Sequence, residues 1–230
     1  MMAVNKRAQS RARSRGHHGR TQAERREQTR RALLDAALNL MDRRESFEAV
    51  SLRSVTRAAG VVPGAFYRHF SSMDELGLAL VDESFRTLRA MRREARVAGL
   101  PARHVIRRSV EVLIEQVLTN RQHFALIARA RTSGNGVLRH AVNNEIRLLM
   151  SELATDLARF PALREWTTDD LGMLAGLLVN TMILHVAEIL DLPVDHGGRP
   201  SSESVAEIAR VAEKQLRLPL LAVPHWRSSP

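Results

Sequence analysis

The chain has 230 residues, no cysteine and a formal net charge of +10. Without cysteine it has no disulfide framework and no thiolate to bind a metal or act as a nucleophile. The charge is uneven, because residues 1–100 carry 20 Arg or Lys against 11 Asp or Glu, whereas residues 101–230 carry 15 against 14. This excess predicts a polyanionic partner for the first part of the chain alone.

Residues 1–20 form a basic arm with six Arg or Lys and no acidic residue. We expect the arm to be disordered, because it has too few apolar side chains to bury. It also lacks the apolar stretch of a secretory signal. Two interpretations stay open: an arm that binds DNA phosphates or enters a minor groove, and a passive solvated tail.

The next elements form a compact helical unit. A first helix is predicted over Thr21–Met41, and a second begins after Ser51, whose hydroxyl is a good N-cap. Gly60 supplies the positive φ that ends a helix, and Pro63 suits the first position of the helix that follows. This order of helix, glycine-containing turn and short helix is typical of a DNA-binding helix-turn-helix.

The helix after Gly60 shows which side chains would meet DNA. Val62, Phe66 and Phe70 are spaced by four residues, which predicts that they face the core. On the other face, small residues allow close approach to base edges, and three polar side chains can donate hydrogen bonds to phosphates or bases. If this helix only filled a core, those donors would be unexplained. The predicted DNA-binding residues are Arg31, Ser51, Arg53, Gly64, Ala65, Tyr67, Arg68 and His69.

The run from Ser51 to Leu80, above all AFYRHF followed by SSMDEL, resembles the TetR family of bacterial transcriptional regulators. Val62 stands where that family usually has Ser or Thr. The longer run Met73–Arg96 is similar to a narrower branch, the acyl-CoA-responsive regulators of fatty-acid biosynthesis typified by the mycobacterial fatty acid synthase regulator. The resemblance implies an all-α fold, with an N-terminal three-helix helix-turn-helix domain and a larger helical domain for ligand binding and dimerisation.

Helical periodicity continues to the end of the chain. Ser72 and Glu75 form a capping box for a helix that is expected to run to about residue 97. Further helices are predicted over 103–118, near 124–132, and over 137–160, 169–190 and 201–216. The predicted organisation is a basic arm (1–20), a helix-turn-helix domain (21–80) with its connecting helix, a ligand-binding and dimerisation domain (81–222) and a tail (223–230).

The segment 169–190 is apolar on nearly every side. Asn180, Thr181, His185 and Glu188 interrupt it, which disfavours a membrane span. We expect it to be buried on every face, by the protein's own core and by a second subunit. The resemblance implies a homodimer formed through the last two helices. His185 and Glu188 have metal-ligand spacing, but without other evident ligands we interpret them as core polar residues or as a feature of a pocket, and we expect no metal.

The chain has no GxSxG, P-loop or HExxH motif, which disfavours an enzyme, and we expect no cofactor. We hypothesise a cytoplasmic homodimer that binds a palindromic operator in double-stranded DNA and is released by long-chain acyl-CoA. The aliphatic second half suits an acyl chain, although ordinary core packing needs the same residues. The alternative is a TetR-type repressor of an efflux or other operon that responds to a small xenobiotic or lipid. Activation and repression stay equally open. The residues predicted to line the acyl chain are Ile106, Val110, Leu113, Phe124, Ile127, Ile146, Leu149, Leu178 and Met182.

Overall fold

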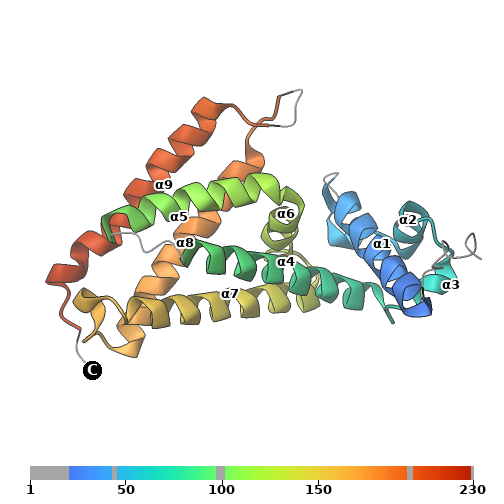
Figure 1. Ribbon diagram of the computed structural model, residues 1–230, viewed down its shortest axis with the longest axis horizontal. Helices are drawn as coiled ribbons and strands as arrows, with labels where there is room; N and C mark the ends of the chain where they lie inside the picture. The colour runs from blue at the N-terminus through green and yellow to red at the C-terminus, as the bar shows by residue number, and fades with distance from the viewer. Residues whose placement is uncertain (1–20, 43–45, 97–101, 196–198, 229–230) are drawn as a thin grey trace, which may run out of the picture.

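The computed structural model describes residues 21–42, 46–96, 102–195 and 199–228, and helices make up most of them (Figure 1). The predicted all-α class is confirmed. The elements are α1 (Gln22–Asp42), the 3-10 helix η1 (Phe47–Ala49), α2 (Leu52–Ala58), α3 (Pro63–Phe66), α4 (Met73–Arg96), α5 (Ala102–Thr119), α6 (Arg121–Ala130), α7 (Gly136–Leu157), η2 (Pro161–Leu163), α8 (Thr168–Asp191), α9 (Ser202–Ala222) and η3 (Val223–His225).

Helices α1, α2 and α3 gather at one end of the molecule, which we call the reading head (Figure 1). Helix α4 leads from the head into a larger body that also contains α5 to α9. One apolar cluster crosses from head to body: Phe47 and Phe66 belong to it, and so do Leu76 of α4, Leu126 of α6 and Leu138 of α7. The head is therefore packed on the body through a shared core.

The turn between α2 and α3 is held by local hydrogen bonds. The Ser51 hydroxyl accepts from the Ser54 amide (3.2 Å), and the Ser54 hydroxyl accepts from the Ser51 amide (3.1 Å), which completes a capping box. Gly60 has a φ of 70°, and the Val61 amide donates to the Thr56 carbonyl at 2.9 Å. The predicted N-cap and the predicted positive φ are both confirmed.

Replacing Ser51 by alanine should lower the free energy of unfolding by about 1 kcal/mol, because an orphan amide at the start of α2 loses its acceptor. Urea denaturation followed by circular dichroism measures this loss. Ser202→Ala is the control, since Ser202 is an exposed serine in the first turn of α9. Equal stability of Ser51→Ala and wild type would contradict the capping role.

The prediction that Val62 faces the core is wrong, because its side chain is 71% exposed. Val62 has an extended backbone and precedes α3, so the four-residue spacing of a helix does not apply to it. Val61 packs against the core in its place. Phe66 and Phe70 are buried, as predicted.

The single chain covers one side of α8, and the predicted burial of its other side by a second subunit stays a prediction. Helix α8 packs against α5, α6, α7 and α9. Its outer side leaves Met173, Leu177 and Leu184 about half exposed. Within the described residues, α8 is the one helix long and apolar enough to cross a membrane by length and composition.

Candidate nucleic-acid interface

Helix α3 and the turn that follows it carry the side chains that the sequence singles out. Gly64 and Arg68 are exposed, Tyr67 is 64% exposed, and Ala65 and His69 are half-buried. No atom lies within 4 Å of the place where a Cβ of Gly64 would stand. The Tyr67 ring meets the buried Phe66 ring edge-on, with centroids 5.6 Å apart. The structure thus brings together five of the eight predicted residues on one open surface.

Helix α1 adds positive charge to this surface. The Arg30 guanidinium lies 5.4 Å from the centroid of the Phe70 ring, close to the end of α3. Burial lowers the pKa of His69, and the nearby charges of Arg26 and Arg30 lower it further. Arg26 and Arg30 are absent from the predicted site list, although their spacing of four residues on α1 places both on one helix face. The surface can therefore bind phosphates around a helix that approaches bases closely.

The other three predicted residues have different surroundings. Arg31 forms ion pairs with Asp35 (3.0 Å) and with Glu83 of α4, so its guanidinium lies between the head and the body. The Ser51 hydroxyl is used as the cap of α2, and Arg53 is exposed on α2. Their contacts with DNA stay predictions.

The turn between α6 and α7 is hydrogen-bonded to η1 and to the start of α4. The Asn135 amide donates to the Glu48 carboxylate (2.9 Å), and its side-chain Nδ2 donates to Asp74 at the start of α4 (2.8 Å). Its Oδ1 caps α7 by accepting from the Leu138 amide (3.1 Å). Backbone hydrogen bonds, from the amides of Glu48 itself and of Asn135, hold the pKa of Glu48 below its usual value.

Gly77 lies at the closest approach in the same region. A Cβ on this residue would stand 2.7 Å from Cζ of Phe47 and 2.9 Å from Cδ1 of Leu138. Helix α4 therefore passes between η1 and α7 with room for a glycine only. The sequence carries no local signal for this joint, since its members lie far apart along the chain.

The nine predicted acyl-lining residues divide between two apolar clusters. Ile127, Ile146 and Leu149 pack in the cluster that the reading head shares. The other six lie in a second cluster, between α5, α6, α8 and α9: Ile106, Val110, Leu113, Phe124, Leu178 and Met182. The structure thus gathers six of the nine predicted residues in this second apolar cluster. We call the whole cluster, which also includes Ile189, the body cluster.

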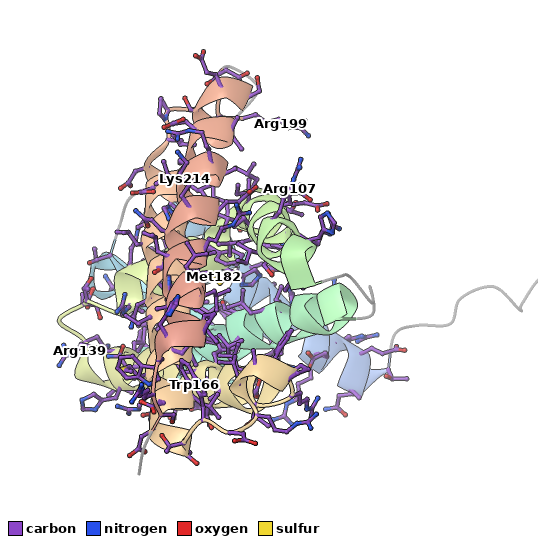
Figure 2. All side chains as sticks on the ribbon, turned by 90° about the vertical axis from the view of Figure 1, so that its left-hand side faces the viewer. Arg107, Arg139, Trp166, Met182, Arg199 and Lys214 are labelled. Carbon is purple, nitrogen blue, oxygen red and sulfur yellow. The ribbon has the colours of Figure 1, made fainter. Side chains whose placement is uncertain are left out.

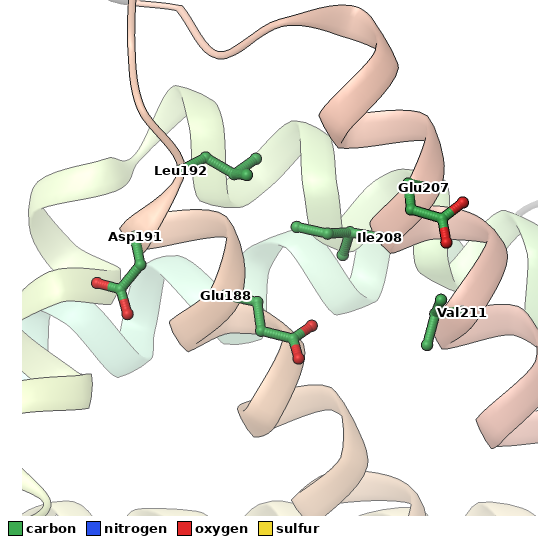
Figure 3. A pocket seen from close by; sticks show the side chains of 6 residues that line it. All are labelled: Glu188, Asp191, Leu192, Glu207, Ile208 and Val211. Carbon is green, nitrogen blue, oxygen red and sulfur yellow. The ribbon is translucent and has the colours of Figure 1, made fainter.

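An open hollow of 440 Å³ lies between the end of α8 and the first half of α9 (Figure 3). Three carboxylates and three aliphatic side chains line it, and none of the nine predicted residues is among them: Glu188, Asp191, Leu192, Glu207, Ile208 and Val211. Glu207 is paired with Arg210 across 2.8 Å, which lowers the pKa of Glu207. The hollow is therefore distinct from the predicted acyl site.

His185 is a buried polar residue, as predicted. Its ring is 1% exposed, with Nδ1 at 2.7 Å from the Glu188 carboxylate and Nε2 at 3.0 Å from the Gln215 amide of α9. Within the described ranges, no group of three or more His, Asp or Glu side chains is placed to hold a metal. The contacts of His185 tie α8 to α9.

The basic arm lies outside the described residues, and its contact with DNA stays a prediction. If the arm binds phosphates, deleting residues 1–20 should flatten the salt dependence of DNA binding. Each lost phosphate contact should reduce the slope of log K against log salt by about 0.9. An unchanged slope in a fluorescence anisotropy series would identify the arm as a passive tail.

Comparison with known proteins finds a family model that matches the part of the chain carrying this surface. Residues 33–80 match the family model described as bacterial regulatory proteins, tetR family. A TetR-like transcriptional regulator from Rhodococcus sp. RHA1 has 22% identity and a TM-score of 0.63, over 88% of this chain and 99% of that one.

Two further structures share the fold at low identity. The fatty acid degradation regulator FadR from Bacillus halodurans has 14% identity and a TM-score of 0.59, over 82% of this chain and 94% of that one. A gamma-butyrolactone receptor has 23% identity and a TM-score of 0.52, over 84% and 98%. Residues 33–80 thus match the model of the tetR family of bacterial regulatory proteins, and the chain shares the fold of a TetR-like transcriptional regulator over most of its length.

Proposed function

We propose that the protein is a cytoplasmic transcriptional regulator that binds a palindromic operator as a homodimer and is released by long-chain acyl-CoA. The observation that carries the proposal is the open surface of α3 and the turn after it, with Arg26 and Arg30 of α1 nearby, packed on a core that continues into the body. A change in the body can reach the DNA-binding surface through that shared core and through the contacts of Asn135 with Glu48 and Asp74.

The outer sides of α8 and α9 support the homodimer. Met173, Leu177 and Leu184 of α8 are about half exposed, and Leu218 and Leu221 of α9 are more exposed still. Helix α9 faces the viewer along its whole length in Figure 2, with Lys214 near its middle. Helices α8 and α9 pack against each other, and exposed large apolar side chains on neighbouring helices favour a protein interface there. A two-fold axis through it would present two α3 helices to two half-sites.

The body cluster supports an aliphatic ligand. Five of its six predicted acyl-lining side chains are aliphatic, and Phe124 is the exception. Among proteins of the same fold, one is a fatty acid degradation regulator and another is a gamma-butyrolactone receptor. The resemblance of Met73–Arg96 to acyl-CoA-responsive regulators favours a long-chain acyl-CoA over a xenobiotic as the ligand.

Release of DNA follows from differential binding. A ligand that prefers a dimer with wrongly spaced α3 helices shifts the population away from the DNA-competent form by its difference in affinity for the two forms. The Asn135 turn and Gly77 tie α7 to the head, so a displacement of α7 changes the position of α3.

A titration of a pre-formed protein–operator complex tests the proposal. Acyl-CoAs of increasing chain length are added, with free CoA and free fatty acids in parallel. Release that grows with chain length and requires the CoA group is the expected result. No release at any length would refute the acyl-CoA effector, and release by a xenobiotic alone would support the alternative regulator of an efflux operon.

A further inference from the structure

The first turn of α6 joins three other helices through three consecutive residues. Arg121 donates to the Leu190 carbonyl at the end of α8. Gln122 Nε2 donates to Asn39 Oδ1 of α1 across 2.8 Å. His123 Nδ1 lies 2.9 Å from the Ser84 hydroxyl of α4. We call this turn the α6 junction, because it links the body to both the reading head and the connecting helix.

One polar atom at the α6 junction is buried without a partner. The Nη1 atom of Arg121 is inaccessible to solvent and meets no hydrogen-bond acceptor among the described residues. Among the described residues, it is the one buried side-chain nitrogen or oxygen atom without a hydrogen-bond partner. A guanidinium keeps its charge at all accessible pH values, so an unpaired buried face of it is costly unless an acceptor arrives.

Two buried apolar residues lie close in sequence to Arg121 or to its acceptor Leu190. Phe124 lies one turn further along α6 and is buried in the body cluster. Ile189, which precedes the carbonyl that Arg121 binds, is fully buried in the same cluster. Arg121 thus combines a cationic donor with the edge of the aliphatic region, which is the chemistry that suits an anionic amphiphile.

We propose that Arg121 binds the oxyanion of an amphiphilic ligand whose aliphatic tail enters the body cluster. Carboxylates and phosphates both accept from guanidinium N–H groups, and the planar fork of arginine matches either of them. The proposal rests on the function proposed above and names the residue that recognises the ligand head. It also gives a route to the DNA, because the next two residues hold α1 and α4.

The test measures direct binding by isothermal titration calorimetry without DNA. The probes are palmitate, palmitoyl-CoA, CoA alone and hexadecanol, a neutral amphiphile of equal chain length. The variants are Arg121→Gln, which removes the charge, and Arg121→Lys, which keeps it without the fork. Arg147→Gln is the matched control, because Arg147 is exposed on α7 and its one described partner is Asn144 on the same helix.

Wild type should bind at least one of the two anionic amphiphiles about 10- to 100-fold more tightly than hexadecanol, as the loss of a charged hydrogen bond implies. Arg121→Gln should lose that difference, Arg121→Lys should keep part of it, and Arg147→Gln should keep all of it. Preference for palmitate would identify a carboxylate, and preference for palmitoyl-CoA would identify a phosphate.

Several results would overturn the anion site. These are equal affinity for palmitate, palmitoyl-CoA and hexadecanol, unchanged affinity in a folded Arg121→Gln variant, and no binding of any amphiphile. If Arg121→Gln does not fold, the comparison of charged and neutral probes on wild type still decides. Operator release by palmitoyl-CoA with no effect of Arg121→Gln would leave the proposed function intact and remove this inference. Binding of an amphiphile that depends on Arg121 but does not release the operator would support the anion site and contradict the proposed function.

Discussion

Gly64→Leu is expected to abolish specific operator binding and to leave the fold intact. Gly64 is exposed, and no atom lies within 4 Å of the place of its Cβ, so the free protein accommodates a larger side chain. Against DNA, the same side chain would occupy the space where α3 approaches base edges. Loss of the base contacts of one half-site, worth about 1–3 kcal/mol for each base pair, should weaken binding by at least about 100-fold.

A gel shift with the operator and with unrelated DNA measures this effect, and circular dichroism confirms the fold. Normal operator affinity of Gly64→Leu would show that α3 docks on DNA in another way.

Gly77→Ala should destabilise the protein, although helix propensity alone predicts the opposite. Alanine in the interior of a helix is favoured over glycine by about 1 kcal/mol. At this position, however, the new methyl group would stand 2.7 Å from Phe47 and 2.9 Å from Leu138, which are both buried. Overpacking of this kind costs about 1–3 kcal/mol, so the free energy of unfolding should fall.

Urea unfolding of Gly77→Ala, Leu138→Ala and the double variant tests the close packing at Gly77. The double variant should lose less stability than the sum of the single variants, because truncating Leu138 makes room for the new methyl group. A Gly77→Ala variant more stable than wild type would show that the approach of α4 to η1 and α7 is not tight.

The helices could be predicted closely from the sequence because their signals are local. The cap at Ser51, the positive φ at Gly60 and the apolar periodicity of α4 to α9 depend on residues within a few positions of one another. The error at Val62 has a local origin too. Val62 is the residue before α3 and has an extended backbone, so the helical spacing that relates Phe66 to its neighbours does not reach it.

The contacts between head and body could not be predicted because they join distant residues. Asn135 meets Glu48 and Asp74, and Gln122 meets Asn39, without any pattern in the chain that marks these pairs. Arg31 shows the same difficulty, since a basic residue before α3 suggests DNA, yet its guanidinium pairs with Glu83. The apolar outer side of α8 differs from these contacts, because hydropathy marks it locally and the sequence predicts a second subunit over the side chains that one chain leaves exposed.

The most direct measurement is a hydroxyl-radical footprint on operators selected from random DNA, with the oligomeric state measured by sedimentation. A dimer that reads DNA through two α3 helices should protect a site with dyad symmetry. Its half-sites should lie about 34–36 Å apart or a multiple of this distance, and the protection should disappear with Gly64→Leu. A monomer at micromolar concentration, a footprint without dyad symmetry, or protection that Gly64→Leu leaves unchanged would contradict DNA reading by paired α3 helices.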